Sequence, residues 1–343
     1  MIVPSRRARP RNAPIRHHRC GDGPSRASDS MPELILHHFA ISPYAEKIRV
    51  VLGLKNLPWR SVDIPMVMPK PDLVALTGGY RRTPVLQIGA DIYCDTALIA
   101  ATIDRLAPEP PLWPRGHEAT ATALARHADT TLFECASVLF GQPHVFEGVF
   151  GADPDAMRAL KADRAAMRQG GAPRPTPADG LATLRSFLAR LEAQLSDGRI
   201  RLLGDAASLA DCAVYHPLWF IAAAPGLAEL LDPFAGVLRW MAGIRSLGHG
   251  RPVPLSSTEA IEIARASTPQ PLEPRSDGEA FAPGDRVEAG PTDYGFDPTM
   301  GELVRLTADE IVVARTDARA GRVRVHLPRL GYQLRAGRPS ASA

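Results

Sequence analysis

Short apolar runs and longer periodic segments alternate along the first hundred residues, which predicts strands and helices in turn. The expected elements are a strand at residues 34–39, a helix at 43–54, a strand at 59–64, a hairpin of strands at 84–88 and 92–94, and a helix at 97–106. Pro43 stands in the first turn of its helix, where a missing N–H is harmless. This alternation predicts an α/β domain at the start of the folded chain.

Farther along the chain, apolar residues recur at intervals of three and four, which predicts long amphipathic helices. Two such stripes are Leu124, Ala128, Leu132, Cys135 and Leu139, and then Leu181, Leu184, Leu188, Leu191 and Leu195. A polar helix at residues 154–168 follows Asp153 and is expected to be a surface insertion. Ser208 and Asp211 have the spacing of a capping box, so they are expected to begin an apolar helix at residues 212–223.

Proline-rich segments at residues 107–115 and 269–274 interrupt these patterns, and several prolines in succession make stiff linkers. After the second linker, short β-branched runs separated by turns predict a small antiparallel barrel. The expected organisation is a tail at residues 1–30, an α/β domain at 31–107, an all-helical domain at 115–268 and a small all-β module at 280–336.

The composition is that of an ordinary globular protein, with 45% hydrophobic and 22% charged residues. A length of 343 residues exceeds one typical domain and favours two or three. No apolar stretch approaches the roughly 20 residues that cross a bilayer, so no membrane partner is expected.

Most of the positive charge lies in residues 1–30, where seven arginines face two aspartates. This local charge of +5 leaves −2 for the rest of a chain whose formal total is +3. A nearly neutral body argues against nucleic acid as a partner, because its phosphates need clustered Lys and Arg. The tail has no secretory h-region, and three interpretations stay open: a mobile tail preceding a working start at Met31, a transit peptide, or a non-specific nucleic-acid arm.

The cysteines Cys20, Cys94, Cys135 and Cys212 are far apart and form no C-x-x-C pair. Neither a dithiol redox motif nor a zinc site is expected, and no other metal site is indicated. We expect reduced thiols, a cytoplasmic location, and packing roles for the last three of these residues.

Three short motifs carry the candidate chemistry. Ser42 lies at the turn before the first helix, where unpaired N–H groups and the positive end of the helix dipole favour an anion. Thr83-Pro84-Val85 precedes a strand, and Asp95-Thr96 opens the helix at residues 97–106. In this order they resemble the glutathione-binding half of the serine-type cytosolic glutathione transferases. The resemblance spans roughly residues 32–266 and leaves out the β-module, which is not typical of that family.

The resemblance implies a thioredoxin-like domain that binds glutathione as co-substrate, an all-helical domain, and a homodimer. Ser42 would hydrogen-bond the glutathione thiolate, whose formation is unfavourable at neutral pH for a thiol with a pKa of about 8.5. Tyr44 is the less favoured candidate for this role, because packing is the simpler interpretation of its side chain. Ser208 and Asp211 would be structural.

The same resemblance assigns the rest of the glutathione site. Thr83 and Pro84 would form a cis-proline turn that exposes the backbone of Val85 to the cysteinyl amide of glutathione. Asp95 would accept from the γ-glutamyl ammonium, and Thr96 would donate to the γ-glutamyl carboxylate. Taken alone, the residues also allow a trans proline and an ordinary helix N-cap.

The leading hypothesis is an enzyme in which the glutathione thiolate attacks a small electrophile. Two alternatives are a non-catalytic binding or regulatory protein of the same fold, and a glutathione-dependent dehalogenase or isomerase. The sequence does not identify the electrophile. It also leaves open which cation, among Lys55, Arg81 and Arg82 beside the expected groove, binds the glycine carboxylate.

Overall fold

A computed structural model describes residues 31–151, 153–278 and 280–337 of the protein, and every structural statement below refers to these ranges. The expected tail at residues 1–30 lies outside them. From Pro32 onward the chain forms one unit. Within the described residues, no helix is both long enough and apolar enough to cross a membrane.

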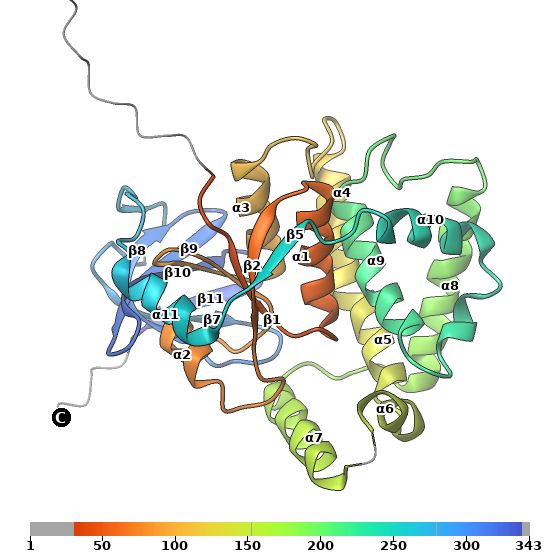
Figure 1. The fold of residues 1–343 in the computed structure, drawn as a ribbon, viewed down its shortest axis with the longest axis horizontal. Helices are drawn as coiled ribbons and strands as arrows, with labels where there is room; N and C mark the ends of the chain where they lie inside the picture. The colour runs from red at the N-terminus through yellow and green to blue at the C-terminus, as the bar shows by residue number, and fades with distance from the viewer. Residues whose placement is uncertain (1–30, 152, 279, 338–343) are drawn as a thin grey trace, which may run out of the picture. The chain divides into compact units, whose positions relative to one another are not determined.

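The first domain has the alternation of strands and helices that the sequence predicts (Figure 1). Its elements are β1 (Ile35–His38), α1 (Pro43–Leu54), β2 (Pro58–Asp63), α2 (Pro71–Thr77), β3 (Val85–Ile88), β4 (Asp91–Cys94) and α3 (Thr96–Leu106). β1 pairs in parallel with β2 and antiparallel with β3, and β3 pairs antiparallel with β4. Every residue of β1, β3 and β4 is buried, so the polar side chains within them need partners, and His37 Nε2 lies 2.8 Å from Gln87 Oε1.

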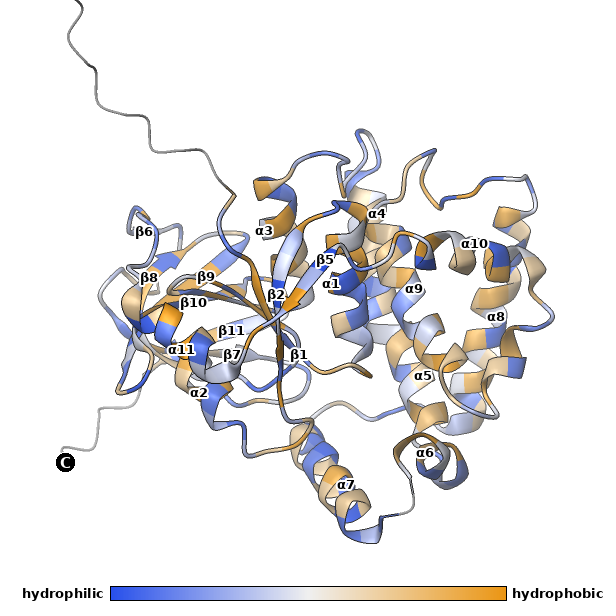
Figure 2. Ribbon diagram, viewed as in Figure 1, coloured by the Kyte–Doolittle hydropathy of each residue, from blue (hydrophilic) through white to orange (hydrophobic). Residues whose placement is uncertain are grey.

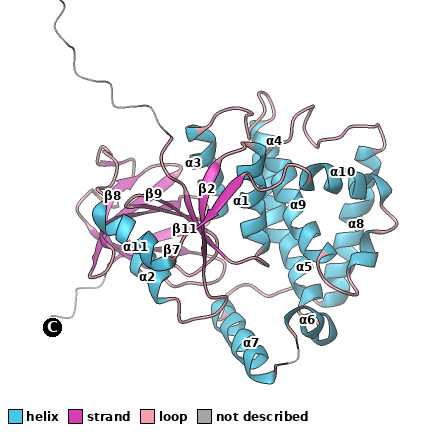
Figure 3. Cartoon of the chain, viewed as in Figure 1, coloured by secondary structure: helices cyan, strands magenta, loops and turns pink. Residues whose placement is uncertain are grey.

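Helices make up the middle of the chain and gather on the opposite side from the strands (Figure 3). They are α4 (Glu118–His127), the π-helical turn η1 (Ala128–Leu132), α5 (Phe133–Phe140), α6 (Pro143–Phe150), α7 (Pro154–Arg168), α8 (Pro177–Leu195), α9 (Leu209–Ala222), the 3₁₀ turn η2 (Ala228–Leu231) and α10 (Ala235–Arg245). Hydrophilic residues cover much of α7 (Figure 2), and only Met157 and Leu160 of this helix are buried. It is the surface helix that the sequence predicts.

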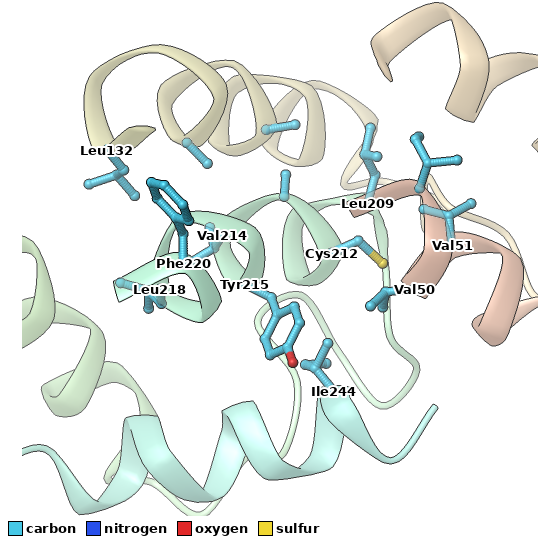
Figure 4. Packing of buried hydrophobic residues seen from close by; sticks show 14 of the residues in the cluster. Val50, Val51, Leu132, Leu209, Cys212, Val214, Tyr215, Leu218, Phe220 and Ile244 are labelled. Atoms are coloured by element: carbon cyan, nitrogen blue, oxygen red, sulfur yellow. The ribbon is translucent and has the colours of Figure 1, made fainter. Parts of the chain in front are cut away.

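The helix α9 forms the centre of the helical domain (Figure 4). Its side chains join one hydrophobic cluster with residues of α1 such as Val50 and Val51. Cys212 is fully buried in this cluster, and burial raises the pKa of its thiol to about 12, so it serves as a small core residue.

A complete capping box begins α9, as the sequence predicts. Asp211 Oδ2 accepts from the backbone N–H and the hydroxyl of Ser208 at 2.9 and 2.8 Å. Asp211 Oδ1 accepts from the N–H of Leu202 and the indole N–H of Trp240, each at 2.9 Å. Because all four donors are structural, the buried Asp211 ties the start of α9 to its surroundings.

The end of the chain contributes one helix and seven strands, and these strands extend the sheet of the first domain. They are β5 (Arg251–Pro254), α11 (Ser257–Ala266), β6 (Arg275–Ser276), β7 (Arg286–Pro291), β8 (Thr299–Leu306), β9 (Glu310–Asp317), β10 (Gly321–Pro328) and β11 (Tyr332–Ala336). β5 pairs with β2 at one edge, and β10 pairs in parallel with β4 at the other. The sheet therefore runs in the order β11-β7-β8-β9-β10-β4-β3-β1-β2-β5, with β6 beside β8.

The small all-β module predicted at the end of the chain is present, but it is not a separate body. Its strands β7–β11 continue an open sheet among the described residues, rather than forming the separate barrel that their spacing suggested. Val323 and Val325 share a hydrophobic cluster with Ile35 and Val62 of the first domain. We refer to β6–β11 as the C-terminal extension, and its core is part of the core of the first domain.

A buried histidine joins the two parts of the sheet where β10 meets β4. The ring nitrogens of His326 lie 3.0 Å from Asp91 Oδ1 and 2.7 Å from Glu310 Oε1, and the ring stacks on Tyr93 at 4.3 Å. Burial lowers the pKa of His326, but hydrogen bonds to the two carboxylates outweigh it and leave that pKa above its ordinary value. The His326 ring thus links β10 to Asp91 of β4 on one side and to Glu310 of β9 on the other.

Candidate functional site

A cavity of about 130 Å³ lies where the first domain, the helical domain and the C-terminal extension meet. The first domain contributes Tyr44, Lys47, Thr83, Pro84, Asp95 and Thr96, among others. The linker before α4 contributes Trp113, and the helical domain contributes Arg126, Asp129 and Thr130. The extension contributes Asp293, Tyr294, Pro328 and Leu330. Four of the residues proposed from sequence for glutathione binding therefore line one cavity.

Asp95 and Thr96 form the start of α3, as predicted. Asp95 Oδ1 accepts from the N–H of Ala97 at 3.0 Å, which is an N-cap bond. The backbone of Asp95 has φ = +74°, a conformation that costs a non-glycine residue on the order of 1–3 kcal/mol. The surrounding structure therefore holds Asp95 in a strained backbone conformation at the cavity wall.

The Thr83-Pro84 peptide bond is cis, in agreement with the family pattern. Both residues line the cavity, whereas Val85 is fully buried and lies in the ladder between His37 and Cys94. Thr83 and Pro84 thus line the cavity, and Val85 does not.

Ser42 caps α1, and its hydroxyl oxygen accepts from the N–H of Ala45 at 3.2 Å. It is 3% exposed and is not among the residues that line the cavity. Tyr44 does line the cavity, and its hydroxyl donates to the carbonyl of Asp129 at 2.6 Å. Burial raises the pKa of the Tyr44 phenol well above its ordinary value, so this side chain remains a hydrogen-bond donor.

A buried ionic cluster that the sequence did not predict lies beside these residues. Lys47 Nζ is 2.7 Å from Asp129 Oδ2 and 3.2 Å from the hydroxyl of Thr96. His216 Nε2 lies 3.0 Å from Asp129 Oδ1. Burial raises the pKa of Asp129, but Lys47 and His216 outweigh it and leave that pKa below its ordinary value. A charged Asp129 therefore holds Lys47 against the start of α3.

Neither the cysteine beside Asp95 nor a metal-binding cluster adds to the chemistry of the described site. Cys94 precedes Asp95 but is fully buried, and burial raises the pKa of its thiol. Among the described residues, no group of three or more His, Cys, Asp or Glu side chains could hold a metal ion.

The C-terminal extension covers one side of the cavity through two contacts. Arg82 lies over the ring of Tyr294 at 3.9 Å and forms an ion pair with Asp293. The N–H of Gly295 in the same loop donates to the carbonyl of Met167, at the end of α7. This loop thus connects the cavity to the surface helix that the sequence marked as an insertion.

A second contact reaches Asp95 directly. The hydroxyl of Tyr332 donates to Asp95 Oδ2 at 3.0 Å across 237 residues of sequence. No local sequence pattern predicts a contact between residues so far apart in the sequence. By contrast, Lys47 stands one turn after Tyr44 on α1, so its helical position was the available signal.

Comparison with known proteins agrees with these features. Residues 36–111 match the family described as "Glutathione S-transferase, N-terminal domain", and residues 147–243 match "Glutathione S-transferase, C-terminal domain". A GST-like protein from Pseudomonas syringae is 40% identical, with a TM-score of 0.73, and the match covers 89% of this chain and 100% of that one. The chain belongs to the glutathione S-transferase family.

More distant members of the glutathione S-transferase fold match a smaller share of the chain. A glutathione S-transferase from Rhodospirillum rubrum F11 is 22% identical over 62% of this chain and 88% of its own, with a TM-score of 0.48. FzlA from C. crescentus is 24% identical over the same shares, with a TM-score of 0.43. No curated protein matches the sequence. Since the Pseudomonas syringae match covers 89% of this chain, its likeness extends beyond the two matched transferase domains.

Proposed function

We propose that this glutathione S-transferase family protein binds glutathione in the cavity and uses its thiolate to attack a small electrophile. The observation that carries the proposal is the meeting of Tyr44, the cis Thr83-Pro84 turn, Asp95 and Thr96 at one cavity. Glutathione acts as co-substrate. We expect a homodimer from the family, and a cytoplasmic location from the separated cysteines.

The γ-glutamyl end of glutathione would bind at the start of α3. The Asp95 carboxylate can accept from the ammonium group, while the Thr96 hydroxyl and the N-terminus of α3 can donate to the carboxylate. Lys47 adds positive charge beside Thr96, since its ammonium lies 3.2 Å from that hydroxyl. The cysteinyl part would then lie along Thr83, Pro84 and the adjoining backbone of Val85.

Ser42 is our first candidate for stabilising the glutathione thiolate. Its oxygen accepts from Ala45, and among the described residues its O–H proton has no acceptor, so it is free to donate to sulfur. The N-terminus of α1 favours the same negative charge. Each unit by which the thiol pKa falls corresponds to about 1.4 kcal/mol of preferential stabilisation of the thiolate. Tyr44 is the second candidate because its phenol faces the cavity.

The glycine carboxylate would bind near Lys70, which the sequence did not single out. The three cations considered from sequence, Lys55, Arg81 and Arg82, are held by ion pairs with Asp104, Asp163 and Asp293. Lys70 is 4% exposed and is not among the residues that line the cavity. Its ammonium lies 3.5 Å from Thr83 Oγ1 and from the carbonyl of Arg81, and 5.5 Å from the centre of the Phe39 ring. Burial lowers the pKa of Lys70 to about 8, which leaves it mostly protonated at neutral pH.

Two observations are compatible with a second function. Ser42 lies outside the cavity, and the Tyr44 hydroxyl already has an acceptor in the carbonyl of Asp129. Both observations are consistent with a non-catalytic binding protein, which needs no group to stabilise a thiolate. A glutathione-dependent dehalogenase or isomerase would use the same groups with a different second substrate.

The conjugation of glutathione to an aryl halide tests the proposal when wild type is compared with Ser42→Ala and Tyr44→Phe. We expect Ser42→Ala to slow conjugation by about tenfold, because one hydrogen bond to a charged group is lost. The ultraviolet absorbance of the bound thiolate should fall in the same variant. Equal rates and equal thiolate in wild type and Ser42→Ala would exclude Ser42, and loss in Tyr44→Phe alone would assign the role to Tyr44. No turnover by wild type with any electrophile tested, despite glutathione binding, would favour the binding protein.

A further inference from the structure

Tyr332, at the start of β11, makes the one side-chain hydrogen bond that joins the C-terminal extension to Asp95 among the described residues. Its hydroxyl lies 3.0 Å from Asp95 Oδ2, while Oδ1 accepts from the N–H of Ala97. Asp95 lines the cavity, and Tyr332 does not. Tyr332 therefore acts on a ligand in the cavity through the lining residues that it contacts. These are Asp95 and Tyr80, whose hydroxyl lies 3.4 Å from that of Tyr332.

Two donors on different oxygens fix the orientation of a carboxylate. The bond from Ala97 alone would leave the group free to turn about one oxygen, and the bond from Tyr332 removes that freedom. A carboxylate has about four lone-pair sites, so each oxygen of Asp95 keeps one with which to accept from a ligand. The two bonds therefore orient the Asp95 carboxylate and leave both oxygens able to accept a further hydrogen bond.

Tyr332 is itself held in place. It is 5% exposed, pairs with Pro291 of β7 in the ladder, and stacks with the ring of Tyr80 at 6.5 Å. Burial and the charge of Asp95 raise the pKa of its phenol well above the ordinary value. The proton that Tyr332 donates to Asp95 thus stays on the phenol throughout the neutral range.

We propose that Tyr332 is a positioning residue of the glutathione site: it holds the Asp95 carboxylate in the orientation that accepts the γ-glutamyl ammonium. The C-terminal extension thereby takes part in recognising the ligand, although it lies outside both matched transferase domains. This inference rests on the proposed binding of glutathione in the cavity.

The test compares two ligands by calorimetric titration into the full-length protein. One is glutathione, and the other is the analogue in which glutaric acid replaces the γ-glutamyl residue, so that only the ammonium group is missing. The ratio of the two dissociation constants reports recognition of the ammonium. A general loosening of the protein weakens both ligands and leaves this ratio unchanged.

We expect wild type to prefer glutathione, and Tyr332→Phe to reduce that preference by about tenfold, toward the ratio found in Asp95→Ala. Tyr215→Phe is the matched control, because Tyr215 is a buried tyrosine of α9 outside the cavity. It should keep the wild-type ratio. Melting temperatures of all variants show that the compared proteins are folded.

Three results decide the matter. A wild-type ratio in Tyr332→Phe, with Asp95→Ala changed, would overturn the positioning role and leave the proposed function standing. The same reduced ratio in Tyr332→Phe and Tyr215→Phe would also overturn it, because the effect would not be specific to Asp95. Failure of wild type to bind glutathione would overturn the proposed function, and this inference with it.

Discussion

The chemistry of the cavity depends on a few charged side chains that are held away from water. Lys47 is fully buried, and its charge is balanced by Asp129, whose side chain is 15% exposed. A buried ion pair contributes little compared with a well-packed apolar pair, but removing one partner leaves an uncompensated buried charge. The cluster therefore makes Asp129 important for stability as well as for the shape of the site.

The substitution Asp129→Ala should lower the free energy of unfolding by about 3–5 kcal/mol, because Lys47 and His216 lose their shared partner. Urea denaturation measures the change. Asp155→Ala is the control, since Asp155 belongs to an exposed pair with Arg158 and should leave the unfolding midpoint where it is. A loss as small for Asp129→Ala as for the control would mean that Lys47 is solvated in solution.

At this scale short sequence motifs predicted residues that the structure brings to one cavity. Asp95, Thr96 and the Thr83-Pro84 turn are recognisable because the capping and turn positions are local in sequence. Lys47 and Tyr332 were not predicted, because their partners lie far along the chain. Lys70 was not predicted because no motif marks a lysine in a loop.

Elements with strong local signals were predicted well. The structure confirms α1 at Pro43–Leu54 and α7 at Pro154–Arg168 with the expected bounds, since each begins with a capping residue followed by proline. The long apolar stripe of residues 124–139 is divided among α4, η1 and α5, which follow one another directly. The short strand β5 was missed because Pro252 and Pro254 remove backbone donors, and its place at a sheet edge explains why prolines are tolerated there.

The partner of a strand is harder to predict than the strand itself. β-branched runs indicated β8, β9 and β10, but nothing in them specifies that β10 pairs in parallel with β4. The pairing is completed by His326, which contacts Asp91 of β4 and Glu310 of β9. Attachment of the extension thus has an electrostatic component that can be measured.

The stabilisation contributed by His326 should depend on pH. Its folded pKa lies above the ordinary value of 6.5, so protonation favours the folded state. The contribution is fully present below about pH 6.5 and is lost as pH rises through the higher folded pKa. In urea titrations, the difference between wild type and His326→Gln should therefore be largest in acid and shrink as pH rises.

The exposed His144 provides the control for this titration, and the difference between wild type and His144→Gln should stay small at every pH. A His326→Gln difference that does not change with pH would show that the ring contributes by packing on Tyr93 alone.

Across the whole molecule, two hydrophobic clusters connect the parts that the sequence separates. One joins α1 to the helical domain, and the other joins the first domain to the C-terminal extension. The predicted division of the chain follows changes of pattern at prolines, whereas the fold places the extension on the sheet of the first domain. The cavity forms where all three parts meet, which is why no single segment predicts it.

The central claim is that glutathione binds at Asp95 and Thr96 in this cavity, and calorimetric titration of glutathione into the full-length protein tests it most directly. We predict binding in the micromolar to low millimolar range, weakened by about tenfold or more in Asp95→Ala and unchanged in the exposed Asp155→Ala. Absence of binding to wild type, or equal binding to wild type and Asp95→Ala, would contradict the claim.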